Sequence, residues 1–196
     1  FMPSRNDLHK YQERMINFIY NAPKCALWAG LGLGKTITTL TAIVDLIDSM
    51  AVSRVLIIAP LRVANSVWHV EAARWQHTKH LKFSIVTGSE KERLAALHKT
   101  ADVYVINREN VSWIVEHYAK KWPFDMIVLD EASSFKSSSS QRFKSLRKTI
   151  PFTNRLVELT GTPSPNGLLD IWSQMYLLDC GERLGRSMTA YKQRFF

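Results

Sequence analysis

An apolar run that ends in a glycine-rich loop is the feature that most constrains this chain. Residues 25–28 read Cys-Ala-Leu-Trp, Gly30, Gly32 and Gly34 follow, and Lys35 and Thr36 come directly after the last glycine. This order predicts a strand, a tight loop and a helix. Glycines let backbone N–H groups converge on an anion, and the next helix directs its positive end to the same point. The pattern therefore predicts a phosphate-binding loop.

The loop departs from the strict phosphate-loop pattern at one position. That pattern has a glycine five residues before Gly34, where this chain has Ala29. A turn without a ligand is the alternative interpretation, but the complete Gly-Lys-Thr ending favours a nucleoside triphosphate. Lys35 is expected to reach the β- and γ-phosphates, and the Thr36 hydroxyl to hold Mg²⁺. The expected nucleotide-binding residues of the loop are Gly30, Leu31, Gly32, Leu33, Gly34, Lys35 and Thr36.

The chain alternates strand and helix patterns, which predicts an α/β fold with a mostly parallel central sheet and helices on both faces. Expected strands are 24–28, 54–59, 82–86, 102–106, 126–129 and 155–159. Expected helices are 8–20, 35–49, 63–75, 90–98, 112–119, 139–149 and 168–178. Right-handed crossovers bring all strand carboxyl ends to one edge, where ligands bind in open α/β sheets. At 196 residues the chain suits a single domain, 1–196.

An acidic pair follows the apolar run 126–129, at the expected carboxyl end of that strand. Asp130 is the candidate Mg²⁺ ligand, and Glu131 is the candidate base that orients or deprotonates the attacking water. Capping of a helix is the other explanation for such a pair. The phosphate loop earlier in the chain favours catalysis by Lys35, Asp130 and Glu131. This interpretation requires the Lys35 and Asp130 side chains to face one another.

The formal net charge of +9 favours a polyanionic partner, although a basic surface alone has the same charge. The basic segment Lys136–Lys148 is either a polyanion track or a solvated helix face. No run of eighteen apolar residues is present, so no membrane span is expected. Cys25 and Cys180 lie in apolar surroundings and are expected to be reduced thiols in a cytoplasmic compartment, bacterial or phage-infected, with a nuclear one also open.

Six ordered motifs resemble the first RecA-like lobe of superfamily-two helicases, and within them the Swi/Snf-type DNA-translocating ATPases of phages and bacteria. These motifs are Leu8–Gln12, Gly30–Thr36, Ile58–Arg62 with Trp68 and Trp75 downstream, Asn107–Asn110, Asp130–Ser133, and Leu159–Asn166 with its trailing residues to Trp172. The resemblance covers residues 8–196. It implies a RecA-like phosphate-loop fold, an ATP and Mg²⁺ requirement, and DNA as a partner.

The resemblance also implies roles for individual residues. Gln12 would read the adenine edge. Thr160 and Thr162 would couple the nucleotide state to movement. Contacts to the backbone of duplex DNA, with little sequence specificity, would come from Pro60, Leu61, Arg62, Asn107 and Arg108. The tryptophans Trp68, Trp75, Trp113 and Trp172 lie in apolar helical patterns, which favour core packing over base stacking.

Two departures from the family pattern stand out. Ser133 occupies the place of the usual histidine, and the second RecA-like lobe with its arginine finger is absent from this chain. We therefore expect weak binding of Mg²⁺·ATP and poor hydrolysis by this lobe alone, with a second lobe as partner. A non-catalytic nucleotide- or DNA-binding module is the competing interpretation. A GTPase is disfavoured because the sequence has no Asn-Lys-x-Asp motif.

Overall fold

The computed structural model describes residues 1–28, 34–131 and 141–160, apart from the side chains of Trp28 and Thr160. Several predictions fall outside these residues. They concern Gly30, Leu31, Gly32, Leu33, Ser133, Lys136, Thr162, Trp172, Cys180 and the helix expected at 168–178. The six predicted strands all lie within the described ranges.

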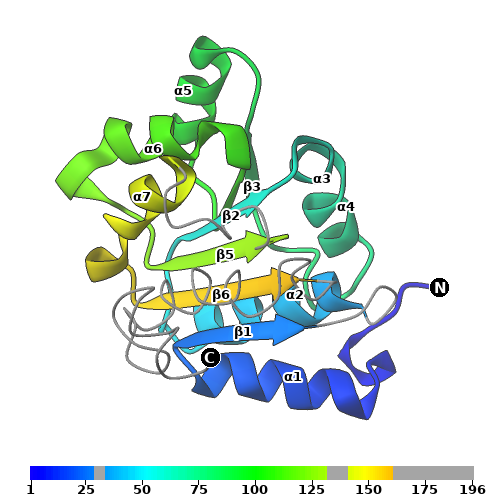
Figure 1. The fold of residues 1–196 in the computed structure, drawn as a ribbon. Coiled ribbons are helices and arrows are strands. Elements are labelled where there is room, and N and C mark those ends of the chain that lie inside the picture. The colour runs from blue at the N-terminus through cyan, green and yellow to red at the C-terminus, as the bar shows by residue number, and fades with distance from the viewer. Residues whose placement is uncertain (29–33, 132–140, 161–196) are drawn as a thin grey trace, which may run out of the picture.

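Six parallel strands form one sheet in the order β1-β6-β5-β2-β4-β3 (Figure 1). The strands are β1 (Lys24–Trp28), β2 (Val55–Ala59), β3 (Phe83–Val86), β4 (Val103–Asn107), β5 (Met126–Asp130) and β6 (Arg155–Thr160). Every residue of β2, β4 and β5 is buried, as expected for strands covered on both faces. The predicted α/β class is confirmed, and the described sheet is parallel throughout.

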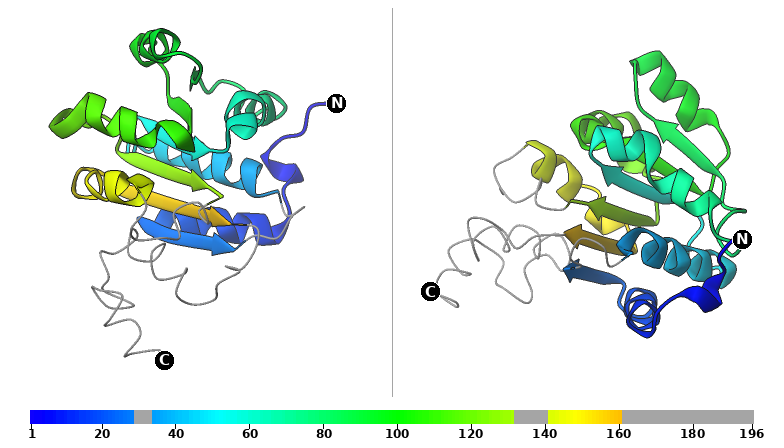
Figure 2. Two further views of the ribbon diagram at one scale, coloured as in Figure 1. Left: turned by 45° about the horizontal axis from the view of Figure 1, so that its top comes forward. Right: turned by 90° about the vertical axis from the view of Figure 1, so that its right-hand side faces the viewer.

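Helices cover both faces of this sheet (Figure 2). The helices are α1 (Lys10–Asn21), α2 (Lys35–Asp48), α3 (Leu61–Ser66), α4 (Trp68–Ala73), α5 (Glu90–His98), α6 (Val111–Tyr118) and α7 (Gln141–Arg147). Short 3-10 turns lie at Arg5–Asp7, Arg108–Asn110, Ala119–Lys121 and Ile150–Phe152. One apolar cluster joins α1, α2, α3 and α4 to the sheet, and a second joins α5, α6 and α7 to the other face.

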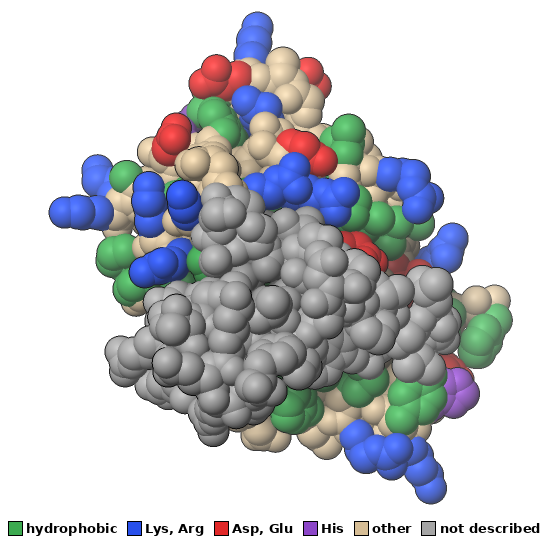
Figure 3. Space-filling model, viewed as in Figure 1, with side chains coloured by type: hydrophobic (Ala, Val, Ile, Leu, Met, Phe, Trp, Pro, Cys, Tyr) green, Lys and Arg blue, Asp and Glu red, His purple; other side chains and the backbone are tan. Residues whose placement is uncertain are grey.

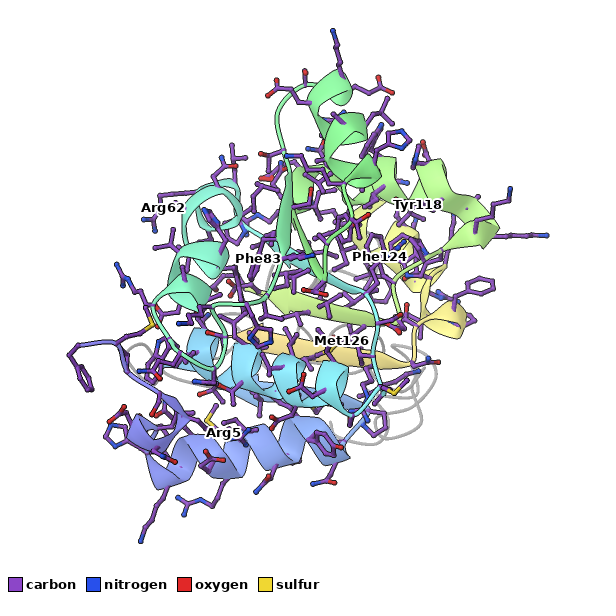
Figure 4. All side chains as sticks on the ribbon, turned by 180° about the vertical axis from the view of Figure 1, so that it is seen from behind. Arg5, Arg62, Phe83, Tyr118, Phe124 and Met126 are labelled. Atoms are coloured by element: carbon purple, nitrogen blue, oxygen red, sulfur yellow. The ribbon has the colours of Figure 1, made fainter. Side chains whose placement is uncertain are left out.

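The buried interior agrees with the sequence pattern. Helix α2 is buried from Ile37 to Val44 because it packs between α1 and the sheet. On the opposite face, Tyr118 and Phe124 pack edge to face with ring centroids 5.7 Å apart (Figure 4). Cys25 is buried, as predicted. Among the described residues, the helices are too short or too polar to cross a bilayer.

The strand boundaries differ from the predicted ones by one residue at several ends, and side chains explain the difference. Asp125 accepts hydrogen bonds from the backbone N–H groups of Ser53 and Arg54, so β2 begins at Val55 instead of Arg54. Asp102 accepts from the Lys82 N–H in the same way, and β3 begins after Lys82. Beyond their predicted ends, β5 extends to Asp130 and β6 to Thr160.

Two helix predictions need correction. The first helix begins at Lys10, not Leu8, because the Gln12 side chain accepts a hydrogen bond from the His9 N–H and forms a capping box. The single helix predicted at 63–75 is two helices. Helix α3 begins after Pro60, which caps it, and a break at Val67 (φ −109°, ψ −59°) separates it from α4.

Candidate functional site

The strand order brings the predicted functional loops to one edge of the sheet. In the order β1, β6, β5, β2, β4, the strands end at Trp28, Thr160, Asp130, Ala59 and Asn107. Thr160 is the register partner of Trp28, and Leu159 is the partner of Asp130. The strand that leads into the phosphate loop and the strand that carries the acidic pair are therefore separated only by β6.

Lys35 meets both acidic candidates at this edge. Its Nζ lies 3.1 Å from Asp130 Oδ1 and 3.3 Å from Glu131 Oε1. The Asp130 side chain is 5% exposed, Lys35 is 19% exposed and Glu131 is 37% exposed. The proximity of Lys35 to Asp130 that the sequence interpretation requires is therefore present, between residues 95 positions apart.

The charge state of Lys35 follows from two opposing effects. Partial burial by itself lowers the pKa of Lys35, because it removes water from the ammonium. The carboxylates of Asp130 and Glu131 oppose this by Coulombic attraction and hydrogen bonding, and the net result is a pKa above the ordinary value. Lys35 is therefore a fixed cation at neutral pH.

Glu131 has a backbone conformation that is uncommon for its residue type. Its φ is +62°, in the left-handed region that glutamate rarely occupies. This backbone conformation destabilises the folded state by about 1–3 kcal/mol for a residue other than glycine, and such residues are frequent at functional sites. Asp130 ends the strand and Glu131 follows it in the left-handed conformation, and both carboxylates reach Lys35 Nζ. The Asp130 side chain is buried and the Glu131 side chain is open to solvent, so the two carboxylates can perform different tasks.

Gly34 and Gln12 fit closely against each other at the start of α2. Gly34 caps the helix with φ +66°, and a Cβ there would lie 2.5 Å from Gln12 Nε2. Only glycine satisfies both conditions without strain. Gln12 is 5% exposed, and its Oε1 accepts from the His9 N–H at 2.8 Å. The predicted adenine-reading residue is therefore held against the last glycine of the loop.

The start of α2 has the chemistry of an anion site. The first turn of this 14-residue helix carries Lys35 and no acidic residue, so its positive end has no compensating charge from its own sequence. The Thr38 and Thr39 hydroxyls donate to the carbonyls of Gly34 and Lys35. Thr36 and Asp130 supply hard oxygen donors, which suit Mg²⁺ held by few protein ligands and by phosphate. The described residues therefore fit a Mg²⁺·triphosphate.

Trp68 is a member of the site that the sequence did not reveal. It is fully buried at the start of α4, as core packing predicted, but its indole Nε1 also donates to Asp130 Oδ2 at 3.0 Å. Each carboxylate oxygen of Asp130 therefore has its own partner, Trp68 on one side and Lys35 on the other. Helical periodicity predicts that the ring is buried, but it does not predict which acceptor the indole N–H contacts.

The first predicted DNA segment follows β2. Pro60 caps α3, Leu61 is 48% exposed, and Arg62 is exposed on the same helix. Figure 4 shows the Arg62 side chain at the outer surface of α3. An exposed guanidinium is a group that can contact a phosphate of a nucleic-acid backbone.

The second predicted DNA segment follows β4, next to β2. Asn107 is 7% exposed, and its side-chain Nδ2 donates to Glu109 Oε2. Asn110 Nδ2 donates to Asn107 Oδ1 at 2.8 Å. Arg93 of α5 extends this network by donating to Asn110 at 2.9 Å. Asn107 thus stabilises its loop internally, and Arg108 is the more exposed of the two predicted contact residues. Since Ala59 is the register partner of Asn107, Arg62 and Arg108 follow neighbouring strand ends.

The basic segment predicted at 136–148 is described only from Gln141 onward. In α7, Phe143 and Leu146 are buried while Lys144 and Arg147 are exposed. This part is an amphipathic helix with a basic solvent face. Lys and Arg side chains gather on the α6 and α7 side of the view in Figure 3 and again beside α3 and α4.

With this geometry established, comparison with known proteins decides the family. The model of the SNF2-related domain matches residues 11–195. The chain belongs to the SNF2-related domain family. The resemblance drawn from the motifs is thereby confirmed, and so is the RecA-like arrangement of the sheet. The matched residues include Lys35, Arg62 and Asp130.

Individual relatives agree with this assignment to the SNF2-related domain. Protein p41 of Acyrthosiphon pisum secondary endosymbiont phage 1 is 42% identical over 95% of this chain and 42% of its own length. The DNA excision repair protein ERCC-6-like of Mus musculus is 30% identical over 93% of this chain and 15% of its own length. The structure is similar to the Sulfolobus solfataricus SWI2/SNF2 ATPase core in complex with dsDNA, with a TM-score of 0.81, 25% identity, and coverage of 96% of this chain and 39% of that one. The chain thus spans less than half the length of each.

Proposed function

We propose that this chain is the ATP-binding lobe of an ATP-dependent duplex-DNA translocase, which hydrolyses ATP to ADP and phosphate when a second RecA-like lobe completes the site. The observation that carries the proposal is the contact of Lys35 with Asp130 at the start of α2. A cation at a helix N-terminus, facing a buried carboxylate, is the arrangement that a Mg²⁺·triphosphate would occupy. The family to which the chain belongs supports the same conclusion.

Each residue of the site has a task in this proposal. Lys35 exchanges its carboxylate partners for the β- and γ-phosphates, guided by the positive end of α2. Thr36 and Asp130 would hold Mg²⁺, which when bound would neutralise charge on the phosphate oxygens. Glu131 would orient or deprotonate the attacking water. Gln12 contacts the adenine from its position beside Gly34, and residues 30–33 line the phosphates.

DNA would cross the edge formed by the ends of β2 and β4. Pro60, Leu61 and Arg62 would contact one stretch of the backbone, and Asn107 and Arg108 a neighbouring one. Such contacts depend on salt and carry little sequence information. The complex of the similar Sulfolobus solfataricus ATPase core with dsDNA supports duplex DNA as the partner.

Coupling between hydrolysis and movement is assigned to Thr160 and Thr162. Thr160 ends β6, between the strand of the phosphate loop and the strand of Asp130. A change at the γ-phosphate would be transmitted through this strand end to a second lobe. The similar proteins are more than twice as long as the part that matches this chain, which is long enough to include such a lobe. We propose that the protein acts in the cytoplasm of a bacterium or of a phage-infected host, and its similarity to a phage protein supports this location.

The experiment compares ATP binding and hydrolysis with and without a second lobe and duplex DNA. We expect the single lobe to bind Mg²⁺·ATP weakly, and the two-lobed protein to hydrolyse ATP faster when DNA is added. Glu131→Gln should keep binding and reduce hydrolysis by about 10²–10⁴-fold, the usual contribution of a general base. If the two-lobed protein binds ATP but shows no turnover with DNA, the non-catalytic binding module is the correct interpretation.

A further inference from the structure

The contact between Trp68 and Asp130 has no task in the function proposed above. Trp68 has no exposed surface, and its ring lies within the apolar cluster formed by α2, α4 and the sheet. Its one polar atom, Nε1, is 3.0 Å from Asp130 Oδ2. A buried indole N–H needs an acceptor, and here the acceptor is the carboxylate of the candidate Mg²⁺ ligand at the reaction edge.

The two oxygens of Asp130 have partners of different character. Oδ2 accepts from an indole N–H that belongs to a rigid, fully packed ring and can only donate. Oδ1 accepts from Lys35 Nζ at 3.1 Å, at the end of a flexible side chain that is 19% exposed. An arriving anion can draw Lys35 away, but Trp68 cannot leave the core without unpacking it. Oδ1 is therefore the oxygen that becomes available to a cation.

We propose that Trp68 is a positioning residue for the divalent-cation site, whose indole N–H holds Asp130 Oδ2 so that Oδ1 faces the cation. The proposal rests on the function proposed above, because it names the residue that orients the Mg²⁺ ligand of that same site. Trp68 contacts no reacting atom itself. It acts only through the carboxylate.

The position of Trp68 in the chain adds a consequence. Trp68 follows the break at Val67 directly, and the helix before the break carries Arg62. The segment that carries the predicted DNA contact therefore reaches the cation ligand six residues later. The hydrogen bond therefore connects α4 directly to the candidate cation ligand.

The effect expected from losing this bond is on metal affinity. A carboxylate without its outer partner adopts several orientations, and the loss of such partners costs about 10–100-fold in metal affinity. Trp68→Phe removes the N–H and keeps an aromatic ring. Trp75→Phe is the matched control, since Trp75 Nε1 donates to Glu71 Oε1 at 3.0 Å within the same region and has no contact with Asp130.

The test measures binding of a fluorescent ATP analogue to the protein and both variants over a series of Mg²⁺ concentrations, and without Mg²⁺. For Trp68→Phe we expect the half-saturating Mg²⁺ concentration to rise about tenfold or more, with affinity for the metal-free nucleotide within about twofold of the parent. Trp75→Phe should change neither value. Circular dichroism checks that each variant is folded.

Three results would overturn the inference. The first is a folded Trp68→Phe variant with the same half-saturating Mg²⁺ concentration as the parent. The second is an equal loss of nucleotide affinity with and without Mg²⁺, which indicates a purely structural role. A parent protein that binds no nucleotide refutes the proposed function itself, and is distinguished because it appears without any substitution.

A second measurement does not depend on the folding of the variant. In the parent protein, hydrogen exchange of the Trp68 indole N–H should be slower than that of the partly buried Trp75, because Trp68 is sealed and bonded to Asp130. Exchange as fast as that of Trp75 contradicts the bond on which the inference depends.

Discussion

The pairing of Lys35 with Asp130 makes a quantitative prediction about stability. Two unit charges 3.1 Å apart attract by about 5 kcal/mol at an effective dielectric constant of 20. Desolvation of both groups offsets much of this, and hydrogen bonds between charged groups contribute about 1.5–3 kcal/mol net. A double-mutant cycle with Lys35→Met and Asp130→Asn should therefore give a coupling free energy of about 1.5–3 kcal/mol.

The same lysine provides its own control. Glu131 also lies within 3.3 Å of Lys35 Nζ, but its side chain is 37% exposed where that of Asp130 is 5% exposed. Water screens the exposed pair, so the cycle of Lys35→Met with Glu131→Gln should give less than about 1 kcal/mol. Urea unfolding at pH 7, followed by circular dichroism, measures all six proteins of the two cycles. A coupling to Asp130 no larger than the coupling to Glu131 would refute the reasoning.

Three further predictions concern titration, the loop glycine and DNA. The pKa of Lys35 is raised above its ordinary value of 10.5, so the charged lysine stabilises the folded state. The difference in unfolding free energy between the parent and Lys35→Met should have its full value below pH 10.5 and decline as the pH rises through the raised pKa. Urea unfolding at several pH values measures this difference. Gly34→Ala should destabilise the fold by about 1–2 kcal/mol in thermal unfolding, and Gln12→Ala in the same chain should restore only part of it, since the positive φ remains. Arg62→Ala and Arg108→Ala should each weaken duplex DNA binding for all sequences, and reduce the slope of log affinity against log salt by about 1, in fluorescence anisotropy titrations.

The local patterns predicted the elements of the fold well. Val55–Ala59 and 126–129 are short, continuous apolar runs with clear ends, as expected for strands that are buried on both faces. The errors at their boundaries came from side-chain acceptors such as Asp125, whose partners lie more than 70 residues earlier in the chain. Such contacts have no signature within a short window of sequence.

The strand order is the part of the fold that periodicity did not predict. Right-handed crossovers predict that the loops share one edge, but they leave open which strands are neighbours at that edge. β1 and β5 both pair with β6, and Lys35 contacts Asp130 across the end of that strand. The phosphate loop and the acidic pair required this contact, but periodicity did not predict the strand order that permits it.

Within the site, the sequence predicted candidates from loop patterns and missed contacts that depend on packing. Lys35 follows a glycine-rich loop, and Asp130 and Glu131 follow an apolar run, so these three residues are conspicuous in the sequence. The hydrogen bond of Trp68 and the positive φ of Glu131 depend on how α4 and β5 meet in space. The break at Val67 was also missed, because the apolar spacing continues across it.

A structure of the protein with Mg²⁺ and a non-hydrolysable ATP analogue tests the central claim most directly. We predict that the triphosphate binds at the start of α2, that Lys35 Nζ contacts a phosphate oxygen instead of Asp130, and that Asp130 faces the Mg²⁺. A nucleotide bound elsewhere, with Lys35 still in contact with Asp130 and Glu131, would contradict the claim.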